Sequence, residues 1–220
     1  MNTILITGSN RGIGLELSRQ FKEKGYHVLA VCRQSSEALD ALDVEVISGC
    51  DVSRAEDLND LKQQLSGRQI DVLLNNAGVL ATNSLGNIDY DSVKWQFAIN
   101  AVAPLQVTET LLPLMSSGGK VAIVTSRMGS VTDNDSGGQY GYRMSKAAVN
   151  MAGKSLSVDL KPKGIAVGLL HPGYVKTDMT SHNGLIDTNE SANGLVAIIE
   201  QLNLDNTGGF WHTNGEALEW

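Results

Sequence analysis

The sequence predicts a doubly wound α/β fold, in which about seven parallel strands form one sheet between two layers of helices. Short apolar, β-branched runs alternate with segments of helical period along the chain. Most of these runs are apolar on both faces, which is typical of parallel strands buried under helices. The 220 residues contain no linker, repeat or low-complexity tract, so we expect a single domain covering residues 1–220.

The expected strands are short and are separated by helical segments. They cover residues 3–7, 27–32, 44–48, 70–75, 120–126, 165–170 and 209–213. Helical periodicity marks the intervening stretches RGIGLELSRQFKEKG, AEDLNDLKQQL and SVKWQFAINAVAPLQVTETLLPLM. This alternation of strand and helix is the pattern of a doubly wound sheet.

Composition and charge exclude several classes of protein. Hydrophobic residues make up 42% of the chain and charged residues 19%, which is ordinary for a globular domain. No window approaches 18 consecutive apolar residues, and the start MNTILITGSN resembles a strand more than a signal peptide, so we expect a cytoplasmic protein without a membrane span. The net charge of −7 argues against nucleic acid and anionic membranes as partners.

The cysteines and histidines give no indication of a metal site. Cys32 and Cys50 match no metal-binding or redox spacing, and we expect both to be small buried residues in a reducing compartment. None of the four histidines, at positions 27, 171, 182 and 212, pairs with a Cys or His at ligand spacing. We interpret His171 as a packing residue at a strand end.

The first expected strand leads directly into a glycine-rich loop that opens a helix. The loop reads Thr7-Gly8-Ser9-Asn10-Arg11-Gly12-Ile13-Gly14. The pyrophosphate of a dinucleotide requires free backbone N–H groups and the positive end of a helix dipole, and glycines let the backbone turn tightly and approach the ligand. A glycine loop between an N-terminal strand and a helix therefore predicts a dinucleotide site.

The spacing TGxxxGxG differs from the GxGxxG of long dehydrogenases and resembles the short-chain dehydrogenase/reductase family, in its short single-domain branch. This resemblance implies a Rossmann domain that binds a nicotinamide cofactor. Asn75-Asn76-Ala77-Gly78 matches the family stretch that supports the sheet and lies against the cofactor ribose. Asp51 and Val52 follow the third strand, where the family has an Asp that binds the adenine amino group; the alternative, a helix N-cap, suits Ser53 better.

The end of the second strand indicates which nicotinamide cofactor is used. NAD-binding proteins place an acid there for the ribose 2′-hydroxyl, whereas this chain has Ala30-Val31-Cys32-Arg33-Gln34. The planar guanidinium of Arg33 suits a 2′-phosphate, and Arg11 in the glycine loop is placed to reach the same group. Basic residues at both places in the family imply NADP(H). An NAD-linked alcohol oxidation is the alternative.

The heptapeptide YGYRMSK at positions 140–146 holds the expected proton donor. Tyr142 and Lys146 are four residues apart and share a helix face, whereas Tyr140 has no such lysine. A free phenol has a pKa of about 10, and a nearby ammonium is expected to lower it. In the family, this pair makes Tyr142 the general acid of carbonyl reduction and the general base of alcohol oxidation, with Lys146 also holding the ribose hydroxyls.

Two further residues complete the tetrad that the resemblance implies. Ser126, in the stretch Ser126-Arg127-Met128-Gly129 after the fifth strand, matches the serine that orients the substrate carbonyl. It lies 16 residues before Tyr142, a few more than is common in the family, and we attribute the difference to the polar loop TDNDSGG. Asn100 matches the asparagine that kinks the fourth helix and helps to hold a water in a proton relay with the lysine.

A last motif follows the sixth strand and reads HPGYVKTDM. By resemblance, Pro172 and Gly173 form a turn, Thr177 binds the nicotinamide carboxamide, and the backbone near Val175 does similar work. Together with the stretch SRMGSVTDNDSGGQYGYRMSKAAVNM, this motif resembles the sniffer-like carbonyl reductases and the bacterial C-signal proteins within the family.

These motifs predict an NADP(H)-dependent oxidoreductase acting on a small carbonyl or alcohol substrate. The alternatives are an NADP-binding signalling protein with incidental turnover and a sugar-nucleotide epimerase, which usually carries an added substrate region. Family members usually form dimers or tetramers through their fourth and fifth helices. The small residues Ala147-Ala148 and Ala152-Gly153 would allow such helix contacts. Residues 180–190 are expected to form a lid.

Overall fold

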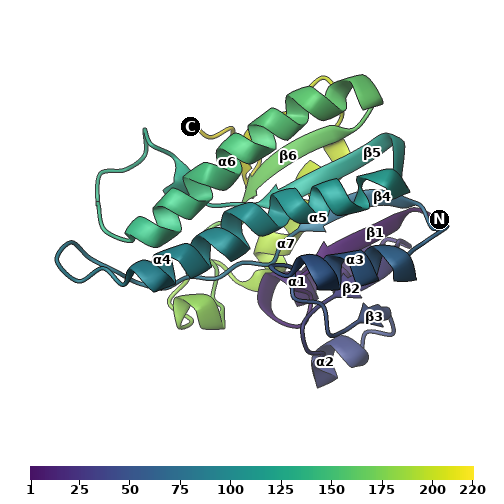
Figure 1. Cartoon of the computed structure of the whole chain (residues 1–220), viewed down its shortest axis with the longest axis horizontal. Helices are drawn as coiled ribbons and strands as arrows, with labels where there is room; N and C mark the ends of the chain where they lie inside the picture. Colours follow the sequence, from purple (N-terminus) through teal and green to yellow (C-terminus); the bar gives the residue numbers. More distant parts are fainter.

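The computed structural model describes all 220 residues and has a single sheet of seven parallel strands. The strand order is β3-β2-β1-β4-β5-β6-β7, with the first crossover back across the sheet between β3 and β4. This is the doubly wound Rossmann arrangement that the sequence predicts, and Figure 1 shows the strands running side by side with their carboxyl ends at one edge. The strands are β1 (Thr3–Thr7), β2 (His27–Val31), β3 (Glu45–Ile47), β4 (Ile70–Asn75), β5 (Met115–Val124), β6 (Ala166–His171) and β7 (Gly209–His212).

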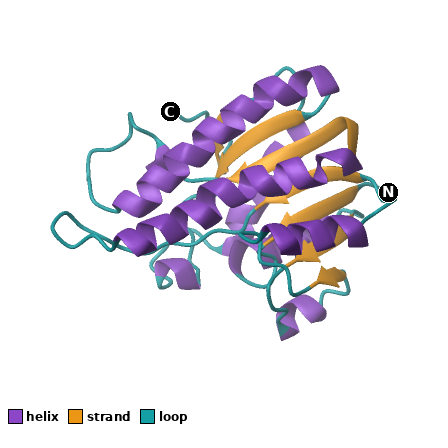
Figure 2. Cartoon of the chain, in the orientation of Figure 1, coloured by secondary structure: helices purple, strands orange, loops and turns teal.

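Helices cover both faces of the sheet (Figure 2). On one face lie α3 (Ala55–Gln64), α5 (Ala103–Leu111) and α6 (Tyr140–Leu160), and on the other α1 (Gly12–Glu23) and α7 (Thr188–Gln201). The remaining α-helices are the short α2 (Glu37–Asp40) and α4 (Tyr90–Phe97), which leads into α5. None of the helices has the length and apolar character needed to cross a bilayer.

The alternation of side chains along each strand divides the core into two clusters. Leu5 of β1 and Leu73 of β4 face α3, α5 and α6, whereas Ile4 and Leu74 face α1 and α7. All four side chains are fully buried, and so are most of their neighbours in the two clusters. Both faces of the strands are therefore apolar, as expected for a parallel sheet between helices.

Two elements differ from the sequence-based expectation. β5 begins at Met115 rather than residue 120, because the pairing with β4 shifts between Ile70 and Val72 and accommodates the extra residues 116–119. The helix expected over residues 92–115 is interrupted by a π-helical segment, η1 (Ala98–Val102), and ends in a 3₁₀ turn. Asn100 lies inside η1, and such π segments are frequent at functional sites.

Candidate active site

The glycine loop connects β1 to α1 at the carboxyl edge of the sheet. Gly8 and Gly12 have φ angles of +68° and +55°, a left-handed conformation that costs glycine little. Ser9 donates a hydrogen bond of 2.6 Å from Oγ to the carbonyl oxygen of Ile6, which fixes the turn. The N–H groups of residues 10–14 have no partner within the protein, and α1 has no side-chain cap. These free donors at a helix N-terminus suit the pyrophosphate of a dinucleotide.

Gly14 allows α1 to pack closely against the rest of the site. A Cβ atom at this position would lie 2.2 Å from the carbonyl oxygen of Gly8 and 2.5 Å from Nδ2 of Asn76. Asn76 in turn donates from Nδ2 to the carbonyl oxygens of Thr7 and Gly8. The glycine loop and the Asn75–Gly78 stretch are therefore joined directly, as the resemblance implies.

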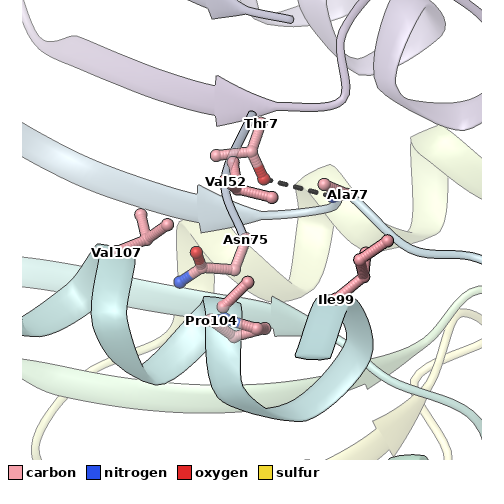
Figure 3. Close-up of a pocket in the computed structure, with 8 residues that line it drawn as sticks. Thr7, Val52, Asn75, Ala77, Ile99, Pro104 and Val107 are labelled. Carbon is pink, nitrogen blue, oxygen red and sulfur yellow. Dashed lines mark hydrogen bonds between the residues drawn. The ribbon is translucent and has the colours of Figure 1, made fainter. Parts of the chain in front are cut away.

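Thr7 also binds the Asn75–Gly78 stretch through its hydroxyl. Its Oγ1 accepts hydrogen bonds from the backbone N–H groups of Asn76 and Ala77, at 3.0 and 3.1 Å. The bond to Ala77 crosses a small, mainly apolar pocket at the ends of β1 and β4 (Figure 3). None of the predicted catalytic side chains lines this pocket, which is formed by Thr7, Val52, Asn75, Ala77, Ile99, Ala103, Pro104 and Val107.

The predicted adenosine-binding residues lie together beyond the ends of β2 and β3. Arg33 is 66% exposed, and its Nη1 is 3.9 Å from Oδ2 of Asp51. Asp51 accepts two hydrogen bonds from Ser53, one from its backbone N–H and one from its hydroxyl. Burial opposes ionisation of Asp51, but these bonds and the charge of Arg33 bring its pKa below the ordinary value. Neither Asp51 nor Ser53 is the N-cap of α3, because that position is Arg54.

The turn after β6 returns to the glycine loop. Gly173 has a φ angle of +84°, and Val175 is buried and bridged to Ile186. A Cβ atom on Gly12 would lie 3.5 Å from Cγ2 of Thr177, so the motif HPGYVKTDM borders the glycine loop. Pro172 accepts a hydrogen bond from the Ser191 hydroxyl of α7.

The Arg11 side chain pairs with the short turn that begins at Asp178. Its Nη1 pairs with Oδ2 of Asp178 at 3.1 Å, and both side chains are largely exposed. Asp178 also pairs with His182 at 3.2 Å. Ser181 and His182 both have positive φ angles, so the backbone of the expected lid is tightly turned here. The assignment of Arg11 to the 2′-phosphate stays a prediction.

Tyr142 and Lys146 lie one turn apart on the buried face of α6. Tyr142 is 8% exposed and Lys146 4% exposed, and Nζ of Lys146 lies 5.7 Å from the centre of the Tyr142 ring. Nζ donates a hydrogen bond of 3.0 Å to the carbonyl oxygen of Val124 at the end of β5. The pair is therefore anchored at the carboxyl edge of the sheet, beside the predicted cofactor site.

Burial governs the protonation of both groups. It raises the pKa of the Tyr142 hydroxyl, and contact with the Ser126 hydroxyl lowers that pKa by less. Burial also lowers the pKa of Lys146 to about 8. The expected lowering of the Tyr142 pKa is therefore wrong for this structure, because desolvation by burial outweighs the contact with Ser126. A phenol that stays protonated near neutral pH is suited to donate a proton.

Ser126 is buried directly after β5 and faces Tyr142. Its Oγ accepts a hydrogen bond of 3.1 Å from the backbone N–H of Met128, which begins a short 3₁₀ turn. Gly129 packs this turn against α6, since a Cβ atom there would lie 2.6 Å from the carbonyl carbon of Lys146. The alternative hydroxyl, Ser130, accepts a bond from the N–H of Asp133 and belongs to the following loop.

Asn100 joins three parts of the site. Its Oδ1 accepts from the N–H of Val79 and its Nδ2 donates to the carbonyl oxygen of Val79, both at 2.8 Å. Nδ2 also donates to Oγ of Ser145 at 3.0 Å. A Cβ atom on Gly78 would lie 3.3 Å from Oδ1 of Asn100 and 3.7 Å from Nζ of Lys146. The Asn100 side chain thus fixes the loop after β4 beside the lysine.

Sequence reasoning overlooked two polar residues near the site, one in this network and one that holds the same loop. Ser145 connects Asn100 to α6, because its Oγ donates to the carbonyl oxygen of Tyr142 at 2.8 Å. Gln96 makes hydrogen bonds to both the N–H and the carbonyl oxygen of Ala81. The position of Ser145 immediately before Lys146 was a usable signal, whereas nothing in the local sequence separates Gln96 from an exposed helical residue.

His171 ends β6 at the same edge of the sheet. Its ring packs edge-to-face against that of His212, with ring centres 4.9 Å apart. Burial, aided by the neighbouring His212, lowers the pKa of His171 to about 3. The imidazole is therefore neutral at ordinary pH, in agreement with a packing role.

Comparison with known proteins places this fold and site in a family. The family model for the short chain dehydrogenases matches residues 2–185. The 1-hydroxy-2-glutathionyl-2-methyl-3-butene dehydrogenase of Rhodococcus sp. is 40% identical to this chain, and the alignment covers 100% of both proteins. It is 46% identical to the C-signal protein of Myxococcus xanthus, over 69% of this chain and 93% of the relative.

Solved structures agree with the sequence relatives. The carbonyl reductase Sniffer of D. melanogaster superposes with a TM-score of 0.91 at 31% identity, over 100% of both chains. A carbonyl reductase from Pseudomonas aeruginosa PAO1 in complex with NADP superposes with a TM-score of 0.88 at 33% identity, again over 100% of both chains. The chain belongs to the short-chain dehydrogenase/reductase family and is an oxidoreductase of that family.

Proposed function

We propose that this protein is an NADPH-dependent reductase of a small carbonyl compound and catalyses the reverse oxidation of the corresponding alcohol. The single observation that carries the proposal is the buried group of Ser126, Tyr142 and Lys146 at the carboxyl edge of the sheet, next to the glycine loop. A protein that only binds a nucleotide has no need for a buried lysine one turn from a buried tyrosine. Similarity to carbonyl reductases, one of them in complex with NADP, supports the same assignment.

The chain's own residues account for proton transfer and substrate orientation. Bound NADPH would supply the hydride to the carbonyl carbon. The Ser126 hydroxyl binds the carbonyl oxygen of the substrate and aligns it with Tyr142. The Tyr142 hydroxyl, kept protonated by burial, gives its proton to that oxygen as the alcohol forms. Lys146 stabilises the phenolate that remains and binds the ribose hydroxyls, while Asn100 holds the neighbouring loop in position.

The donors around the glycine loop fit NADP(H). The free N–H groups of residues 10–14 would bind the pyrophosphate, and Asn76, Ala77 and Gly78 would lie against the ribose. Val52 and Asp51 would hold the adenine. Arg33 is exposed and its one ion pair, with Asp51, is loose at 3.9 Å, so its guanidinium would be available for the 2′-phosphate. Pro172, Gly173, Val175 and Thr177 would hold the nicotinamide end; Thr177 lies beside the glycine loop, because a Cβ atom on Gly12 would be 3.5 Å from its Cγ2.

A direct test is the consumption of NADPH with a panel of aldehydes, ketones and quinones. The proposal requires turnover of at least one compound by the wild-type chain and none by the Ser126→Ala, Tyr142→Phe double variant. A panel that includes conjugates of glutathione is appropriate, because a relative 40% identical to this chain is named for a glutathionyl substrate.

The C-signal relative supports a second candidate function, in which the chain is an NADP-binding signalling protein. This candidate predicts tight cofactor binding without turnover of any compound in the panel. Signalling activity that the Tyr142→Phe variant retains would favour this candidate, because the change removes the proton donor and leaves the glycine loop intact.

We also propose that two copies of the chain associate through α4, α5 and α6, which lie side by side on one face (Figure 1). The supporting observation is a set of exposed apolar side chains on these helices and on η1, namely Trp95, Val102, Leu105, Met144, Met151 and Val158. Three of them recur every seven residues along α6, so they share a face. Gly153 is not part of this face, because a Cβ there would lie 2.8 Å from Leu169 of β6. Met151→Glu should convert the dimer or tetramer to monomer in light scattering.

A further inference from the structure

Three side chains near the start of α6 end in buried polar atoms that have no hydrogen-bond partner within the protein. The atoms are Nδ2 and Oδ1 of Asn83, Oε1 of Gln139 and Nε of Arg143. They are four of the six such side-chain atoms in the chain. Buried polar atoms are almost always paired in folded proteins, so a group of four unpaired atoms calls for an explanation.

The backbones of the three residues are joined to one another. The N–H of Gln139 donates to the carbonyl oxygen of Asn83, and the N–H of Arg143 donates to the carbonyl oxygen of Gln139, both at 2.9 Å. Gln139 is the N-cap of α6 and has a φ angle of +51°, which is unfavourable for a residue with a side chain. Residues held in this conformation occur disproportionately at ligand sites. The loop after β4, the loop before α6 and the first turn of α6 therefore meet here.

Arg143 ties this group to the catalytic serine. Its Nη1 donates to the carbonyl oxygen of Met128 at 3.4 Å, and the N–H of Met128 donates to Oγ of Ser126. Its Nη2 donates to the hydroxyl of Ser136 at 2.8 Å. The guanidinium thus contacts one carbonyl and one hydroxyl but no carboxylate. By contrast, the nearby Arg127 already pairs with Asp133.

The free atoms define the chemistry of a matching ligand. Arg143 presents an unpaired N–H and an uncompensated positive charge, which favours a carboxylate. Asn83 offers both a donor and an acceptor, and Gln139 an acceptor, which are the complements of an amide group. Asn83 and Gln139 lie at the start of α6, the helix that carries Tyr142.

We infer that Asn83, Gln139 and Arg143 form a recognition site for an amide-and-carboxylate group on the substrate, as found in an N-acylated amino acid or a peptide conjugate. This inference rests on the proposed carbonyl reduction and specifies its substrate class. Arg143 binds the carboxylate, and the side-chain amides of Asn83 and Gln139 bind the amide of the ligand.

Two aldehydes of the same aromatic core test the inference. N-(4-formylbenzoyl)glycine carries an amide and a carboxylate, whereas methyl 4-formylbenzoate carries neither and has a para substituent that withdraws electrons to a similar degree. The wild-type chain should reduce the first with a kcat/KM at least tenfold higher than the second. Arg143→Met should remove this preference through a higher KM for the glycine conjugate, so that the ratio of the two kcat/KM values approaches one.

Matched variants separate recognition from a structural role. Arg127→Met removes a neighbouring guanidinium that is already paired, and should leave the ratio of the two kcat/KM values unchanged. Arg143→Lys keeps the charge and should restore part of the preference, and Asn83→Ala should lower it about threefold to tenfold. Circular dichroism shows whether each variant is folded.

The possible outcomes are distinct. Equal losses for both aldehydes in Arg143→Met, or a loss of preference in Arg127→Met alone, would overturn the recognition site while leaving the proposed reduction in place. Reduction of neither aldehyde by the wild-type chain, together with failure of the wider panel, would refute the proposed function and this inference with it.

Discussion

Nζ of Lys146 donates a hydrogen bond of 3.0 Å to the carbonyl oxygen of Val124, the last residue of β5. This bond fixes the lysine at the carboxyl edge of the sheet and keeps its ammonium 5.7 Å from the centre of the Tyr142 ring. The same burial that holds the lysine in place lowers its pKa to about 8. The Lys146 side chain therefore loses its positive charge near pH 8, within the range in which activity can be measured.

Carbonyl reduction should depend on pH through Lys146. Below pH 8 the lysine is charged and stabilises the phenolate left after Tyr142 gives up its proton, and above pH 8 that support is lost. We expect kcat/KM for an aldehyde to fall as the pH rises through about 8. The pH profile of Lys146→Met should be lower throughout and should lack this step. A wild-type profile that stays flat from pH 7 to about 9 would contradict the assignment of Lys146.

Cofactor preference should depend on Arg33. Its guanidinium is exposed and near the end of β2, where it can bind the 2′-phosphate that distinguishes NADP from NAD. Hydrogen bonds to a charged group contribute about 1.5–3 kcal/mol, so Arg33→Ala should weaken NADPH binding about tenfold to a hundredfold. NADH binding should change little. Arg54→Ala removes an arginine that pairs with Glu56 and Asp57 and serves as the control in the same fluorescence titration.

Gly14→Ala should disrupt the cofactor site. The new Cβ would lie 2.2 Å from the carbonyl oxygen of Gly8, so either α1 or the loop must move. Overpacking of this kind costs about 1–3 kcal/mol, and we expect a lower urea midpoint together with loss of NADPH binding. Gly25→Ala is the matched control, because no atom lies within 4 Å of its Cβ position. Its strained φ angle should lower stability without affecting cofactor affinity.

Acid stability should depend on His171. Its pKa is lowered to about 3 by burial, with His212, Arg127 and Lys146 adding to the effect, whereas the unfolded chain protonates near 6.5. The unfolded state therefore binds more protons between these values, and stability falls as the pH drops from 6.5 toward 3. His171→Leu should flatten this fall in urea unfolding at pH 4 to 7, whereas His182→Gln, at an exposed position, should leave it unchanged. Identical slopes in wild type and His171→Leu would argue against the buried neutral imidazole.

The fold could be predicted from the sequence because its signals are local. The expected strand boundaries agree with the observed ones within two residues, except for the start of β5, which lies five residues earlier, at Met115. The register shift opposite Ile70 that lengthens β5 depends on pairing between strands distant in sequence. The π segment at Asn100 was foreseen only as a kink, by resemblance to the family.

The sequence indicates which residues lie at the candidate site, but it does not indicate how burial changes their pKa values. Spacing along a helix places Lys146 one turn from Tyr142, but it does not show how deeply the pair is buried. Burial reverses the direction expected for the pKa of Tyr142. Likewise, the exposed pairing of Arg11 with Asp178 joins residues 167 positions apart, and no local pattern indicates it. Long-range contacts and desolvation thus account for what the sequence did not reveal.

The central claim is that the buried hydroxyl of Tyr142 donates the proton in carbonyl reduction. The most direct measurement compares wild type and Tyr142→Phe in single-turnover reduction of a reactive aldehyde, with NADPH binding followed separately by fluorescence. Loss of a general acid typically costs about 10²–10⁴-fold in rate, so the rate should fall by that factor while NADPH affinity stays within about threefold. A variant that binds NADPH and reduces the aldehyde at the wild-type rate would contradict the account.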